Sequence, residues 1–220
     1  MKHAKAALIF LLLGYLNLGA VIITGDGLNI GSGNTLSSDS GVVGSNNTMN
    51  GSQADGNLIV GRYNTIDYET EDSLIVGYGN SIGEEESRII LLGYANTGGG
   101  HAAIAMGGLN SVGGYYAVAI GYSNMINRLR AYGIGTGLIS DKQEVVYLGR
   151  YNDTTIIPDE ETRILVVGNG NGVVSDPAER SNALIVYENG DLSVQQDVYA
   201  RNVILDEPAG DISMGQFGEN

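Results

Sequence analysis

A glycine recurs through most of this chain at the end of a short apolar run, and an asparagine usually follows it three residues later. The phrase SLIVGYGNSIG at 73–83 returns as AVAIGYSNMIN at 117–127 and as NLIVGRYNTID at 57–67. Four successive spacings of 14 residues set the period, and longer spacings indicate insertions. A short fixed period predicts a solenoid in which each repeat forms one coil. The recurring glycines are Gly31, Gly44, Gly61, Gly77, Gly93, Gly107, Gly121, Gly135, Gly149 and Gly168.

Two apolar columns precede the glycine, at one and at three positions before it. Because side chains alternate along a strand, both columns share one face, and we predict that this face forms the core. A third apolar column, five positions after the glycine, predicts a second short strand facing the same interior. The first column is Ile30, Val43, Val60, Val76, Leu92, Met106, Ile120, Ile134, Leu148 and Val167; the second is Leu28, Leu58, Leu74, Ile90, Ile104, Val118, Tyr132, Val146 and Leu165; the third is Leu36, Met49, Ile66, Ile82, Val112, Ile126 and Val173.

The position between the first two columns is also apolar in eight of the ten units, although on this assignment it faces outward. Strands that are apolar on both faces are normally buried on both, and a long exposed apolar stripe is normally covered by a partner. The stripe predicts a homo-oligomer, but it supports association more firmly than it supports a specific number of chains. The expected interface includes Ile59, Ile75, Leu91, Ala105 and Ala119.

An asparagine stands three positions after the glycine in nine of ten units, and only Leu138 breaks the column. Asparagine tolerates the left-handed region and bonds its own backbone at turns, and stacked asparagines can also bond from coil to coil. A ligand site is built once, whereas this feature is built nine times, so we interpret it as a structural turn ladder. It includes Asn64, Asn80, Asn96, Asn110, Asn124 and Asn152.

The composition supports a β fold and an exported protein. Thirty-four glycines among 220 residues disfavour helices, and the chain has no cysteine. Its net charge of −14 argues against nucleic-acid binding. The first residues carry lysines, then an apolar run, then small residues, which predicts a signal peptide and a secreted or cell-surface location. We predict a signal peptide at 1–20, a repeat domain at 21–173, a C-terminal cap at 174–205 with a hairpin-like turn ENGD, and a tail at 206–220.

The phrases YYAVAIGYSNMI (115–126), HAAIAMGGLNSVGG (101–114) and DSLIVGYGNSIG (72–83) resemble the head repeat of the YadA-like trimeric autotransporter adhesins. The resemblance covers residues 28–173. It implies an all-β, left-handed parallel β-roll of about ten 14-residue coils, association of three chains, and attachment to host matrix or cell surfaces. No coiled-coil stalk or outer-membrane anchor follows in this sequence, unlike in the complete adhesins.

No catalytic, cofactor-binding or metal-binding residues are predicted, because His101 gives no histidine cluster and no motif places acids in a catalytic pair. Acidic runs at 67–72, 84–86 and 159–161 fall in the insertions, where they form either solvated loop edges or a calcium site. The candidate binding residues are Tyr78, Tyr94 and Tyr122, directly after the glycine, although aromatic stacking between strands also explains them.

The leading hypothesis is therefore a secreted, non-enzymatic, trimeric β-roll with a structural or adhesive role toward a glycan or a matrix protein. The mature chain is expected to have no membrane span. The alternatives are a carbohydrate-binding or carbohydrate-active β-solenoid and a phage-fibre-like trimeric module. An ice-binding solenoid needs a flat array of regularly spaced threonines, and no column of this repeat provides such an array.

Overall fold

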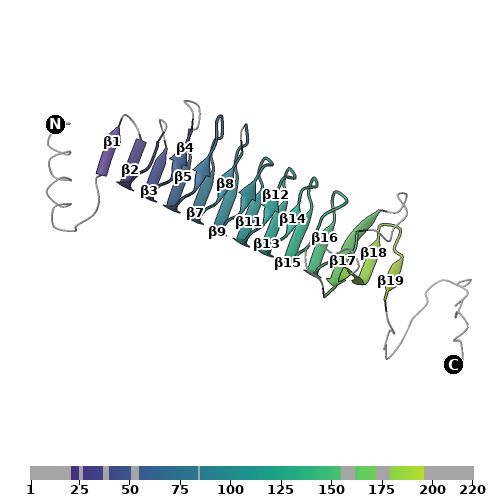
Figure 1. Cartoon of the computed structure of the whole chain (residues 1–220). Coiled ribbons are helices and arrows are strands. Elements are labelled where there is room, and N and C mark those ends of the chain that lie inside the picture. Colours follow the sequence, from purple (N-terminus) through teal and green to yellow (C-terminus); the bar gives the residue numbers. More distant parts are fainter. Residues whose placement is uncertain are drawn as a thin grey trace, which may run out of the picture.

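The computed structural model describes residues 21–24, 27–36, 40–50, 55–83, 85–154, 162–171 and 179–195. The predicted signal peptide and the predicted tail lie outside these residues, as do the acidic run at 159–161 and Val173 of the third apolar column. The described residues are all-β and stack as an elongated rod (Figure 1). The rod is a β-solenoid of about eight turns, whereas the sequence predicted about ten coils.

Ten parallel strands in one long sheet form the main wall of the rod, with antiparallel strands at both ends of that sheet. Strand β1 (Val21–Thr24) closes the N-terminal end by pairing antiparallel with β2, and a hairpin closes the C-terminal end. The parallel strands are β2 (Gly27–Ser32), β3 (Gly41–Ser45), β5 (Leu58–Arg62), β7 (Leu74–Tyr78), β9 (Ile90–Tyr94), β11 (Ile104–Gly108), β13 (Val118–Tyr122), β15 (Tyr132–Thr136), β16 (Val146–Arg150) and β17 (Arg163–Asn169).

A second, narrow wall consists of six parallel two-residue strands, one for each of six successive repeats. These strands are β4 (Thr48–Met49), β6 (Thr65–Ile66), β8 (Ser81–Ile82), β10 (Thr97–Gly98), β12 (Ser111–Val112) and β14 (Met125–Ile126). The C-terminal hairpin is formed by β18 (Asn182–Tyr187) and β19 (Leu192–Val194). The turn between them is ENGD, as the sequence predicted.

Register in the long sheet follows the repeat glycine, because each of these glycines pairs with that of the next unit. Gly77 pairs with Gly61 on one side and with Gly93 on the other. A Cβ atom at Gly77 would lie 1.8 Å from the carbonyl oxygen of Gly93, and the φ angle of Gly77 is +136°. The repeated glycine is therefore required by the close approach of successive coils.

The core lies on the opposite face of the long sheet from the one that the sequence indicated. Ile59, Ile75 and Leu91 are fully buried, whereas Val76 and Leu58, which were predicted to point inward, are 37% and 40% exposed. The third apolar column, five positions after the repeat glycine, was predicted correctly: Met49, Ile66, Ile82, Val112 and Ile126 are buried, and Leu36 packs against the core.

This reversal corrects the predicted oligomer interface. Ile59, Ile75, Leu91, Ala105 and Ala119 are all fully buried inside the single chain and cannot contact a partner. Burial of a large aliphatic side chain stabilises the fold by about 1.5–3 kcal/mol. An aspartate at Ile59 or Ile75 would therefore unfold the chain rather than dissociate an assembly.

The inner face of the long sheet was predicted wrongly because both faces of that sheet are apolar. A further column in phase with the true core stands four positions before the glycine and holds Ile89, Ala103, Ala117, Ala131 and Val145, all fully buried. Small side chains recur in these inward columns because a short coil encloses little space. Alanine and glycine in alternate positions are the sequence signal that could have identified the inner face.

Candidate functional surfaces

An apolar face covers the outer side of the long sheet. It consists of the two columns at one and three positions before the repeat glycine, and we call it the apolar face. Ile134 is its most exposed member, at 49%, and the other clearly exposed members are Leu28, Leu58, Val76, Met106 and Tyr132. Monomeric soluble proteins rarely expose a continuous apolar patch that runs along a whole sheet.

The asparagine column forms a buried hydrogen-bonded ladder. The Asn80 side-chain amide donates to the Asn64 side-chain oxygen (3.0 Å) and to the Gly93 carbonyl (2.9 Å). The Asn80 side-chain oxygen accepts from the backbone N–H and the side-chain amide of Asn96 (2.9 and 3.1 Å). Equivalent bonds link Asn34, Asn47, Asn64, Asn80, Asn96, Asn110 and Asn124.

The ladder changes at Leu138, where the sequence predicted a break, and also beyond it, where the sequence predicted none. At the break, the backbone N–H of Leu138 still donates to the side-chain oxygen of Asn124 (3.0 Å). Asn152 then bonds the backbone of Ile139 rather than another asparagine, and Asn171 is exposed. The sequence suggested that the asparagine takes the left-handed conformation in this turn. In the structure the residue before it does so, for example Tyr63 or Ala95.

The candidate binding tyrosines Tyr78, Tyr94 and Tyr122 lie along the turn that follows the long strands, which we call the tyrosine corner. It comprises the first and second positions after the repeat glycine. Tyr78 and Tyr94 stack with ring centroids 5.8 Å apart and ring planes 19° apart, and Tyr63 meets Tyr78 edge to face at 5.4 Å. Tyr122 is separated from Tyr94 by Gly108 and is 52% exposed. The stacked rings therefore present their edges to solvent more than their faces.

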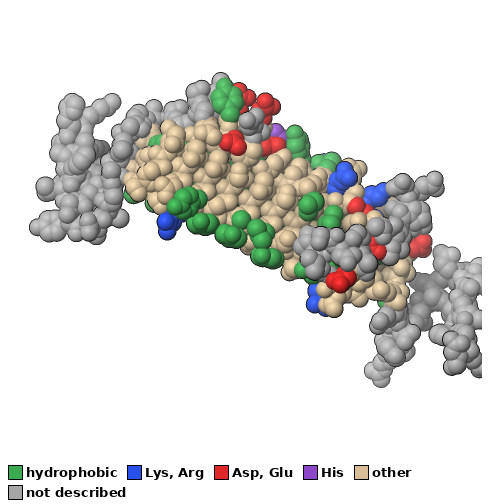
Figure 2. Space-filling view, in the orientation of Figure 1, with side chains coloured by type: hydrophobic (Ala, Val, Ile, Leu, Met, Phe, Trp, Pro, Cys, Tyr) green, Lys and Arg blue, Asp and Glu red, His purple; other side chains and the backbone are tan. Residues whose placement is uncertain are grey.

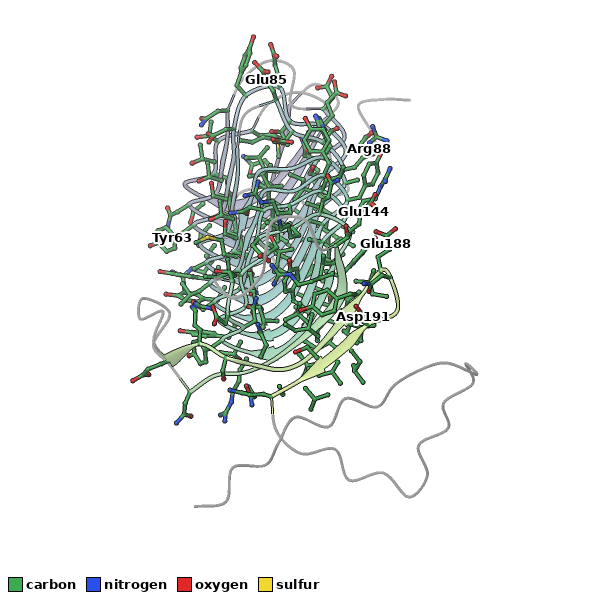
Figure 3. All side chains as sticks on the ribbon, turned by 90° about the vertical axis from the view of Figure 1, so that its right-hand side faces the viewer. Tyr63, Glu85, Arg88, Glu144, Glu188 and Asp191 are labelled. Atoms are coloured by element: carbon green, nitrogen blue, oxygen red, sulfur yellow. The ribbon has the colours of Figure 1, made fainter. Side chains whose placement is uncertain are left out.

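The described residues of the acidic runs at 67–72 and 84–86 lie at the opposite turn, which we call the acidic corner. Consecutive turns pair there through their backbones: the Glu71 N–H donates to the Glu86 carbonyl, and the Glu85 N–H donates to the Tyr68 carbonyl. Seen along the rod, Tyr63 projects from one side while Arg88 and Glu144 project from the other (Figure 3). In the space-filling view, one group of acidic side chains lies at the upper edge of the rod, and others lie toward its C-terminal end (Figure 2).

His101 has partners at the acidic corner that the sequence reading missed. Its Nδ1 lies 2.8 Å from the Ser87 hydroxyl, and its Nε2 lies 3.9 Å from Oε2 of Glu86, whose side chain is largely buried. Desolvation is the main cause that raises the pKa of Glu86, and the nearby His101 opposes this rise. Ser87 and His101 are 14 residues apart, so the repeat period itself could have placed them side by side.

A buried ionic cluster lies near the C-terminal end of the rod. Arg163 and Asp141 form an ion pair, and the Tyr147 hydroxyl donates to Asp141 (2.8 Å). Arg163 and Tyr147 are almost fully buried, and desolvation is the main cause that raises the pKa of Tyr147. The cluster joins the last turns of the rod to strand β17.

A row of hydroxyl side chains lies on the narrow sheet, which the sequence reading did not find. Register pairs Thr48 with Thr65, Thr65 with Ser81, Ser81 with Thr97 and Thr97 with Ser111, and Thr35 precedes Thr48. The row is one residue wide and mixes Thr with Ser, and Met125 ends it. It is therefore a single line of mixed Thr and Ser hydroxyls and not the flat array of regularly spaced threonines that an ice-binding solenoid needs.

The described residues give no metal centre, since no three His, Asp or Glu side chains among them are placed to hold an ion. A cavity of about 210 Å³ lies beneath the C-terminal hairpin and is lined by Arg180, Ser181, Asn182, Ile185, Ser193 and Gln195, none of them a carboxylate. Within the described part of the chain, no helix is both long and apolar enough to cross a membrane.

Neither known family models nor curated proteins match this sequence.

Proposed function

We propose that the chain is an exported, non-enzymatic structural or adhesive protein that works as a homo-oligomer. The observation that carries this proposal is the apolar face, which runs along the long sheet and has no cover from the described part of the same chain. Covering such a face by other copies removes its apolar surface from water. The predicted outward stripe was assigned to the wrong columns, but an outward apolar stripe remains.

A trimer is the favoured state, and the resemblance to YadA-like head repeats supports this number and the left-handed coil. The signal-peptide layout of residues 1–20 supports the export of the chain. In this proposal the rod displays several copies of a weak surface toward a glycan or an extracellular matrix protein. Several weak contacts made at once raise the overall affinity without a deep binding pocket. A stiff solenoid suits this role because it holds the copies at fixed positions along one axis.

Light scattering of residues 21–220 tests the assembly. We expect a stable oligomer, and we expect V76D or I134D to give folded monomers with unchanged circular dichroism. Met125, which is 46% exposed on the narrow sheet, provides the matched control, and M125D should keep the wild-type mass. A monomeric wild-type protein, or full assembly in both apolar-face variants, would contradict the proposal. Arrays of glycans and matrix proteins then test attachment with the oligomer and with the monomeric variants.

A further inference from the structure

Tyr122 differs from the other two candidate tyrosines, because its ring contacts no other aromatic ring among the described residues. Tyr78 and Tyr94 come from successive coils in register, and each covers one ring face of the other. The coil after Tyr122 instead places Thr136 in register with it, and the coil before it places Gly108 there. Neither neighbour has a ring, so no aromatic side chain covers the ring of Tyr122, which is 52% exposed.

One side of the Tyr122 ring lies against the backbone of the preceding coil. A Cβ atom at Gly108 would lie 3.4 Å from Cδ2 and 3.5 Å from Cε2 of Tyr122, so the ring leans toward Gly108. Its other side is turned toward the next coil, where the side chain of Thr136 is too short to cover a phenol ring. An aromatic ring face therefore stays open to solvent at this level of the rod.

Side-chain hydroxyls without a hydrogen-bond partner accompany this open ring. Within the described part of the chain, the hydroxyls of Tyr122, Ser123 and Thr136 all lack such a partner. The residues that follow Tyr78 and Tyr94 are glycine and alanine, so among the three candidate tyrosines only Tyr122 is followed by a hydroxyl residue. The combination of an open aromatic face with unpaired hydroxyls thus distinguishes this coil from the stacked tyrosines.

These groups match the chemistry of a sugar ring better than that of a protein surface. One face of a pyranose carries C–H groups, which leave water favourably against an aromatic ring. Its edge carries hydroxyls, which need hydrogen-bond partners when water is displaced. A protein partner needs a contact area of about 800 Å² on each side, whereas a convex turn two residues wide offers only a small surface around one ring.

We propose that Tyr122, Ser123 and Thr136 form a binding site for one pyranose ring of a neutral glycan. The sugar ring lies on the open face of Tyr122, and the hydroxyls of Ser123 and Thr136 bond its hydroxyl groups. The ligand is neutral because these three residues carry no charge and the chain's net charge of −14 repels anionic glycans. The site is shallow and each contact is weak, so the inference rests on the proposed multivalent display and names its ligand class and residues.

An array of neutral oligosaccharides of glucose, galactose, mannose and N-acetylglucosamine identifies a probe, and NMR titration with that oligosaccharide measures its affinity. Y122A should weaken binding by at least about tenfold, whereas Y122F, which keeps the ring, should stay within about threefold of the wild type. T136Y should also weaken binding by at least about tenfold, because a tyrosine there covers Tyr122 as Tyr94 covers Tyr78. Y116A is the control, since Tyr116 is 55% exposed at the opposite turn and should leave binding unchanged. Circular dichroism verifies that each variant is folded.

The outcomes separate this inference from the proposed function. Wild-type protein that binds no neutral oligosaccharide, or full binding by Y122A and T136Y, overturns the inference. An equal loss in Y116A and Y122A also overturns it, because exposed tyrosines would then bind without a defined site. Light scattering of the same samples reports on self-association independently: an oligomer without sugar binding keeps the assembly and loses the site, whereas a monomer that binds sugar through Tyr122 keeps the site and contradicts the assembly.

Discussion

At the scale of single residues, two glycines of the same coil are glycines for different physical reasons. Both Gly77 and Gly79 have positive φ angles, of +136° and +64°. A Cβ at Gly77 would collide with the Gly93 carbonyl, whereas a Cβ at Gly79 would meet no atom within 4 Å. The same residue type thus serves two different purposes two positions apart.

We expect G77A to destabilise the fold by more than about 4 kcal/mol, because successive coils must move apart to admit the methyl group. G79A should cost about 1 kcal/mol, the ordinary penalty for an L-residue in the left-handed region. Urea denaturation followed by circular dichroism measures both. Equal costs for the two variants would show that the backbone angle, and not the contact between coils, fixes the repeated glycine.

At the scale of elements, the asparagine ladder is the part of the fold that the sequence predicted best. Strict recurrence identified both the column and its structural role, and the structure adds the bonds. Leu138 shows what the ladder tolerates, since the Asn124 side-chain oxygen keeps its bond to the backbone there. The sequence could not show that the preceding residue takes the left-handed conformation, because glycine, alanine, leucine, serine and tyrosine all occur at that position.

N80A removes four hydrogen bonds from a buried site, two donated and two accepted by the side chain. We expect a loss of about 2–4 kcal/mol, because the Asn96 N–H and the Asn64 oxygen lose buried partners. N50A is the control, since Asn50 is exposed and its side chain makes one hydrogen bond within the described residues, to Asp67. Urea denaturation of both variants gives the difference. A loss below about 1 kcal/mol for N80A would mean that the ladder is incidental to stability.

The long sheet shows where sequence reasoning failed at this scale. Period-2 alternation assigns the faces of a strand only when one face is polar. Here Leu74 and Val76 on one side and Ile75 on the other are all apolar, so hydrophobicity alone could not choose between them. The buried alanines Ala103, Ala117 and Ala131 identify the interior by size instead, because the narrow coil admits only small side chains at those levels.

At the scale of the whole molecule, a solenoid needs both of its ends closed. An open end would expose the core and an unpaired strand edge, which recruits other chains. Here the parallel order of the long sheet switches to antiparallel at β1 and again at β18. The sequence indicated the C-terminal closure through its ENGD turn, whereas β1 follows directly on the predicted leader and was not predicted as a strand.

The hairpin β18–β19 is therefore expected to govern both stability and solubility. Ile185 pairs with Val166 of β17, is only 6% exposed and belongs to the core cluster. I185D should detach the hairpin and cost about 3–5 kcal/mol, because it removes a buried aliphatic side chain and places a carboxylate against the core. Uncovered β17 edges should then cause aggregation that grows with protein concentration.

L192D is the control, since Leu192 lies in the same hairpin and is 58% exposed. Thermal unfolding and light scattering over a concentration series measure both effects, and an I185D variant as stable and soluble as L192D would show that the hairpin is not the cap.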